Sequence, residues 1–96
     1  MKCTTYHYFF KNLANPLKVN IISMLKSREM SVTEICNELK EEQSKISHAL
    51  TSLYSCNIVE SRQDGKNKIY SLNKKTILPL LKAVDSHNCD FCRKNN

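Results

Sequence analysis

The only glycine of this 96-residue chain, Gly65, follows Asp64 between two short stretches, 58–63 and 68–72. An Asp-Gly pair between strand-like stretches is a strong hairpin signal, because glycine readily adopts the positive φ that a tight turn requires. We therefore predict a β-hairpin formed by these two stretches. The segments on either side of it show helical spacing of apolar residues. The pattern predicts a mainly helical chain that carries one β-hairpin.

Local capping signals position the helices. Asn15 is a favourable N-cap, and Pro16 suits the first helical position, where its missing N–H costs nothing. Ser31 and Glu34 form a capping box, in which each side chain satisfies an exposed amide of the other residue. The predicted helices cover 4–13, 16–26, a segment opened by the Ser31 capping box, 43–55 and 76–88.

The start of the last helix depends on Pro79. If Thr76 is the N-cap, Pro79 falls in the first turn, where no intrahelical N–H is needed. An earlier start at Asn73 would place Pro79 inside the helix and kink it. We therefore predict that Thr76 caps this helix.

The order of these elements describes a single domain, 1–96. Two short helices joined by a tight turn, 31–55, form a helix-turn-helix, and the hairpin that follows, 58–72, is its wing. The predicted fold is thus a winged helix-turn-helix with the order ααααββα. Residues 1–14 and 76–88 supply its outer helices, and 89–96 form a polar tail.

The charge balance and the outer face of 43–55 point to nucleic acid. The chain has 15 Lys+Arg against 9 Asp+Glu, a net charge of +6. The outer face of that helix has short polar or basic side chains and no carboxylate, as suits a helix reading base edges in the major groove. Basic residues on the wing can reach phosphates. The predicted DNA-binding residues are Gln43, Ser44, Lys45, Ser47, His48, Arg62, Lys66 and Lys68.

Other classes of function find little support in the sequence. No apolar stretch is long enough to cross a membrane, and no secretory signal is recognisable, so we expect a cytoplasmic protein. No glycine-rich phosphate loop, nucleophile–base pair or carboxylate pair indicates an enzyme. A winged helix that binds a protein instead of DNA is the alternative, but such a helix would carry an apolar or acidic outer face.

Several runs together resemble the ArsR/SmtB family of metal- and arsenic-sensing repressors. They are LANPLK (13–18), SVTEI (31–35), QSKIS (43–47) and DGK (64–66) with YSL (70–72). The resemblance implies a repressor that dimerises through its first and last helices and binds an imperfect inverted repeat in double-stranded DNA. An inducer would then release it from the operator. Family members usually have a glycine near Lys40 and a Ser/Asp cap near Glu42, and this chain has charged residues there instead.

The same resemblance guides the search for an inducer site among the five cysteines. The family's arsenic-type positions hold Ser31 and Thr33 here. The first half of its zinc-type site holds Lys74 and Thr76, and only the second half is matched, by His87 and Asp90, so neither site has a full ligand set. A third arrangement in the family combines cysteines of the helix that corresponds to 43–55 with cysteines of the C-terminal tail. One of these helix positions corresponds to Cys56 here, and the tail supplies the C-x-x-C pair Cys89 and Cys92.

We therefore predict a soft-ion site built on Cys89 and Cys92 and completed by Cys56, Cys3 or His87. Thiolates favour Zn²⁺, Cd²⁺, Pb²⁺ or trivalent arsenic. Three alternatives stay open: a Cys89–Cys92 disulfide that acts as a redox switch, tail cysteines with no sensory role, and a repressor that senses no inducer. Cys36 lies on an apolar helix face and is predicted to pack in the core.

Overall fold

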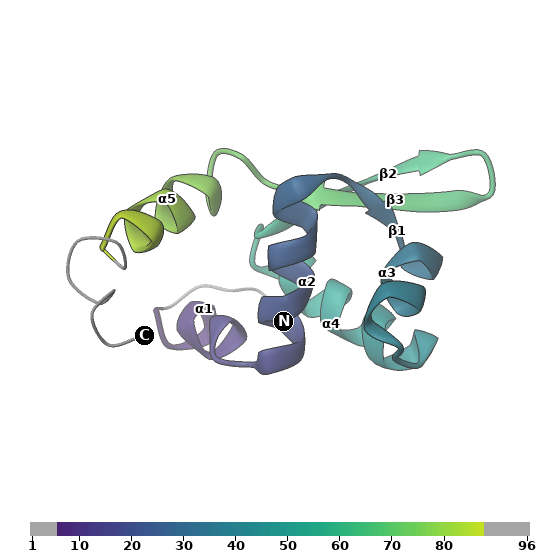
Figure 1. Ribbon diagram of the computed structural model, residues 1–96, viewed down its shortest axis with the longest axis horizontal. Helices are drawn as coiled ribbons and strands as arrows, with labels where there is room; N and C mark the ends of the chain where they lie inside the picture. The colour runs from purple at the N-terminus through teal and green to yellow at the C-terminus, as the bar shows by residue number, and fades with distance from the viewer. Residues whose placement is uncertain (1–5, 88–96) are drawn as a thin grey trace.

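The computed structural model describes residues 6–87, and its elements follow the predicted order with one short strand added. The described residues form five helices and three strands, and Figure 1 shows how they are arranged. They are α1 (Tyr6–Leu13), α2 (Pro16–Ser27), β1 (Met30–Ser31), α3 (Val32–Leu39), α4 (Gln43–Ser55), β2 (Val59–Asp64), β3 (Asn67–Leu72) and α5 (Leu78–His87). This is the winged helix-turn-helix that the sequence predicts.

The wing belongs to a three-stranded antiparallel sheet in the order β1-β3-β2. In β2 and β3, Asp64 is paired with Asn67, so Gly65 and Lys66 form the loop between them. Gly65 has a φ of +63°, which is the positive value that the Asp-Gly pair predicts for this turn. The sequence did not predict β1, which joins the sheet by pairing Met30 with Tyr70.

The core lies between the helix-turn-helix, α2 and the base of the wing. Its fully buried side chains come from α2, α3, α4 and the turns that precede β2 and α5. They include Ile21, Ile35, Ile46, Leu50, Leu53, Ile58 and Ile77. Cys36 is half-buried and packs against this core as a free thiol, as its place on the apolar face of α3 predicts.

The predicted caps of α2 and α3 are confirmed. The Asn15 side chain accepts a hydrogen bond from the backbone N–H of Lys18 at 3.1 Å. In the capping box the N–H of Ser31 donates to Glu34 at 2.9 Å, and the N–H of Glu34 donates to the Ser31 hydroxyl at 3.2 Å. The bond from the Ser31 backbone and a weaker one from Arg28 lower the pKa of Glu34. These contacts fix where the helix-turn-helix begins.

The turn between α3 and α4 uses a left-handed residue that is not glycine. Lys40 has φ 55° and ψ 47°, and its N–H donates to the carbonyl of Cys36 as the C-cap of α3. Glycine adopts this conformation more easily than lysine does. Glu42 occupies the N-cap of α4 and makes no side-chain cap bond. The two positions where the sequence departs from the family that it resembles are therefore the two ends of this turn.

The last helix begins later than predicted. α5 starts at Leu78, and the N–H of Leu81 donates to the carbonyl of Ile77 at 2.9 Å. Thr76 does not cap the helix, because its hydroxyl donates to the carbonyl of Asn57 at 2.5 Å. Pro79 still falls in the first turn, as the argument from its missing N–H required.

The two outer helices lie at the opposite end of the molecule from the wing tip (Figure 1). Their surfaces leave large apolar side chains in contact with solvent: Tyr6 is 85% exposed and Phe10 55% on α1, and Val84 is 54% exposed on α5. None of the helices in 6–87 is long and apolar enough to cross a membrane. Among the described residues, four of the six exposed large apolar side chains therefore lie on these two helices.

Candidate nucleic-acid interface

The predicted DNA-reading face of α4 is exposed, because the opposite face is anchored in the core. Ile46, Ala49, Leu50 and Leu53 are buried on the inner side. On the outer side Gln43, Ser44, Lys45 and His48 are exposed and Ser47 is half-buried. The helix therefore presents polar and basic groups on a rigid support.

Lys45 is free to move toward a ligand at little cost. Its ammonium lies 3.6 Å from a carboxylate oxygen of Glu41, one helical turn away, and its side chain is 62% exposed. Exposed pairs of this kind contribute about 0–1 kcal/mol. A phosphate or a base edge can therefore replace Glu41 as the partner of Lys45.

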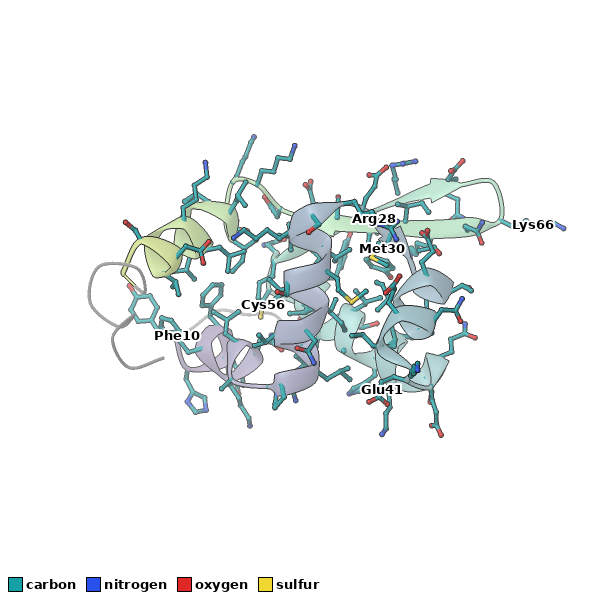
Figure 2. All side chains as sticks on the ribbon, viewed as in Figure 1. Phe10, Arg28, Met30, Glu41, Cys56 and Lys66 are labelled. Carbon is teal, nitrogen blue, oxygen red and sulfur yellow. The ribbon has the colours of Figure 1, made fainter. Side chains whose placement is uncertain are left out.

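The three predicted wing residues have different surroundings, and all are exposed. Lys66 projects from the wing tip (Figure 2). Arg62 is hydrogen-bonded to Glu29, and this pairing raises the pKa of its guanidinium. Lys68 lines a hollow between the wing and α4, together with Thr51 and Tyr54. Lys68 thus lies between the tip of the wing and the face of α4.

A polar cluster that the sequence did not predict joins α1, α2 and the last turns of α4. Asn12 is only 7% exposed, and its carbonyl oxygen accepts hydrogen bonds from Lys18 Nζ at 2.7 Å and Ser52 Oγ at 2.7 Å. Lys18 Nζ lies 3.1 Å from Ser52 Oγ. The amide nitrogen of Asn12 donates to Cys56 Sγ at 2.9 Å. Because a buried amide must be satisfied, this cluster fixes how α1 meets α4.

The predicted cysteine site is only partly covered by the described residues. Cys56 (Figure 2) is 8% exposed at the C-terminal end of α4 and is disulfide-bonded. Its sulfur accepts the hydrogen bond from Asn12. His87 is the last residue of α5. Cys3, Cys89 and Cys92 lie outside the described residues. Within 6–87, no three His, Cys, Asp or Glu side chains are grouped as metal ligands, so the soft-ion site stays a prediction.

Comparisons with known proteins agree with this geometry. The family model described as "Bacterial regulatory protein, arsR family" matches residues 15–61, from the cap of α2 into β2. An HTH-type transcriptional regulator of Methanocaldococcus jannaschii, MJ1325, is 32% identical over 77 residues, which are 79% of this chain and 86% of that protein. The chain belongs to the ArsR family. The family assignment that the sequence motifs suggested is confirmed.

Two other similar proteins show how much of the chain the similarity covers. The crystal structure of Rv0081 from M. tuberculosis has a TM-score of 0.80 at 31% identity and covers 91% of this chain and 88% of that one. The transcriptional repressor SmtB homolog of Synechocystis is 33% identical over 79 residues, 82% of this chain. The chain spans 60% of the length of that repressor and 65% of the length of the Rv0081 protein.

Proposed function

We propose that the protein is a cytoplasmic, homodimeric repressor of transcription that binds an imperfect inverted repeat in double-stranded DNA. The observation that carries the proposal is the outer face of α4, which is exposed, polar to basic and flanked by a basic wing. In this geometry a helix enters the major groove and the wing reaches the flanking phosphates. Two recognition helices would then contact half-sites about one helical turn apart.

The homodimer is supported by the apolar surface at the far end of the domain. Tyr6, Phe10 and Val84 are each more than half exposed on α1 and α5. Apolar residues grouped at one end of a small soluble domain are typical of a subunit interface. Pairing two copies through this end would leave both wings and both α4 faces open to DNA.

Base contacts and phosphate contacts are expected to respond differently to substitution. Lys45→Ala or His48→Ala should lower the preference for operator over random DNA by about 10-fold, since losing a base contact costs about 1–3 kcal/mol. Lys66→Ala or Lys68→Ala should weaken binding to both duplexes by similar factors. Gel shifts on the DNA upstream of the protein's own gene, with a random duplex beside it, measure both ratios.

These paired variants also define what would overturn the proposal. If Lys45→Ala lowered the affinity for operator and random DNA equally, the assignment of α4 to the major groove would be wrong. If the wild-type protein bound neither duplex at low salt, the proposed DNA-binding function would be wrong. Wild-type binding should weaken steeply with added salt, because neutralising phosphates releases counterions.

We further propose that a soft metal ion or metalloid releases the repressor from DNA by binding Cys89, Cys92 and Cys56, with Cys3 or His87 completing the set. Zn²⁺, Cd²⁺, Pb²⁺ and trivalent arsenic suit such thiolate ligands. Support comes from the place of Cys56. It lies at the C-terminal end of α4, and its sulfur contacts Asn12 of α1. A ligand bound there would act on the recognition helix and on the dimer end together.

Titration of the reduced protein with Zn²⁺, Cd²⁺ and arsenite tests this site. Reduction is required because Cys56 is disulfide-bonded in the structure and must be a thiolate to bind an ion. We expect thiolate charge-transfer absorbance and loss of the gel shift with at least one ion. The double variant Cys89→Ser/Cys92→Ser should lose both responses while still binding DNA.

Cys36→Ser is the matched control, because Cys36 is a free thiol outside the proposed ligand set. Its ion affinity should equal that of the wild type. If the double variant binds each ion as tightly as the wild type, the ligand assignment is wrong.

A further inference from the structure

A groove between the start of α2 and the first half of α4 is not accounted for by the predicted DNA contacts. Its described lining residues are neutral or basic, and none is acidic: Asn15, Leu17, Lys18, Ser44, Lys45, His48 and Ala49. Its volume is about 550 Å³, which is ample for a phosphate group. Two lysines and a histidine around one groove favour an anion as its ligand.

Lys18 gives this groove a positive charge that is held in place. Its ammonium donates to Asn12 Oδ1 at 2.7 Å and lies 3.1 Å from Ser52 Oγ. Both partners are neutral, and Lys18 is in none of the ion pairs found in the described part of the chain. Lys45, by contrast, shares its charge with Glu41. Lys18 is therefore a cation that is positioned by the buried cluster but not neutralised.

The start of α4 adds to this charge. The N-cap residue Glu42 makes no side-chain cap bond, so no side chain of its own satisfies the first amides of this 13-residue helix. Free amides and the helix dipole make a helix N-terminus favourable for anions. Ser44, in the first turn of α4, lines the groove. The dipole thus acts on the same space as the Lys18 ammonium.

The position of the groove identifies the anion. Ser44, Lys45 and His48 belong both to the groove and to the face of α4 that we assign to the DNA major groove. We propose that the groove binds a backbone phosphate of the DNA strand that borders the major groove, with Lys18 as its fixed cation. This inference rests on the proposed DNA-binding function. Phosphate contacts of this kind set the register of a protein on DNA and carry no sequence information.

The test compares Lys18→Met with Lys26→Met. Both substitutions remove one lysine charge from α2, but Lys26 is paired with Asp85 at 2.5 Å and does not line the groove. Dissociation constants are measured on the upstream DNA and on a random duplex over a range of salt concentrations. Lys18→Met should lower affinity about 10-fold per groove at 0.1 M salt and reduce the salt slope by about one per groove, equally on both duplexes. Lys26→Met should leave the slope nearly unchanged.

Two further measurements separate a phosphate contact from a loss of structure. Lys18→Arg retains the charge and should restore the wild-type salt slope. Single neutral methylphosphonates placed along the operator should reveal one position per half-site that weakens the wild type but not Lys18→Met. Circular dichroism confirms that each variant is folded before binding is compared.

The outcomes distinguish the inference from the function on which it rests. If the wild type binds DNA while Lys18→Met and Lys26→Met give equal salt slopes, the phosphate assignment is wrong. If the wild type binds no DNA, the proposed function fails first. Titration with inorganic phosphate at constant ionic strength tests for a free anion. Tight phosphate binding that Lys18→Met abolishes, with DNA affinity unchanged, would assign the groove to a small ligand and overturn the inference.

Discussion

Replacing Phe10 with glutamate is expected to convert the protein from a dimer to a monomer and to weaken operator binding by on the order of 100-fold. Phe10 is 55% exposed on α1, next to Phe9, whose ring meets it edge to face at 5.4 Å between centroids. A carboxylate at this position would be buried without a partner in the dimer, and burying an unpaired charge is costly. Each half-site would then be bound by a separate monomer.

Sedimentation measures the dissociation, and gel shifts on a full inverted repeat and on a half-site measure its effect on DNA. The variant should bind the half-site as the wild type does and lose only the gain from the second half-site. Val19→Glu is the matched control, because Val19 is an apolar residue of α2 that is 45% exposed. A dimeric Phe10→Glu variant, or equal dissociation of both variants, would exclude α1 as the specific interface.

Elements that depend on neighbouring residues were predictable from the sequence. The Asn15 cap with Pro16, the capping box at Ser31 and the tight turn at Gly65 act over three residues or fewer, and each appears as predicted. The strand β1 was not predictable in this way. Met30 and Ser31 become a strand only because they pair with β3, about 40 residues later. Thr76 fails as a cap for the same reason, since its hydroxyl partner, Asn57, is 19 residues away.

In the candidate site, too, the features set by neighbouring residues were predictable, and those set by distant residues were not. Helical periodicity predicts which face of α4 is exposed, because one face must pack on the core. Periodicity does not predict the buried cluster, in which Asn12 contacts Ser52 and Cys56 across separations of 40 and 44 residues. Nor did the sequence mark Lys18 as different from the other lysines. The polar residue Asn12, near the end of a helix rich in aromatic residues, was the one signal available.

Replacing Leu50 with alanine is expected to lower the free energy of unfolding by about 2–5 kcal/mol. Leu50 is 0% exposed and lies in the middle of α4, on the face that anchors the helix to the core. The substitution removes buried apolar contacts and leaves a cavity. A domain of this size changes its Tm by about 4–8 °C per kcal/mol, so the midpoint should fall by at least about 8 °C.

Thr51→Ala is the control for this variant, because Thr51 is the exposed neighbour of Leu50 on the same helix. Its hydroxyl donates only to the Ser47 carbonyl at 2.9 Å, so its loss should change stability by about 0.5 kcal/mol or less. Thermal denaturation must be followed at equal protein concentration, since dimer formation itself raises the midpoint. A Leu50→Ala midpoint equal to that of Thr51→Ala would mean that α4 is not held by this core. The rigid support on which its DNA-reading face depends would then be absent.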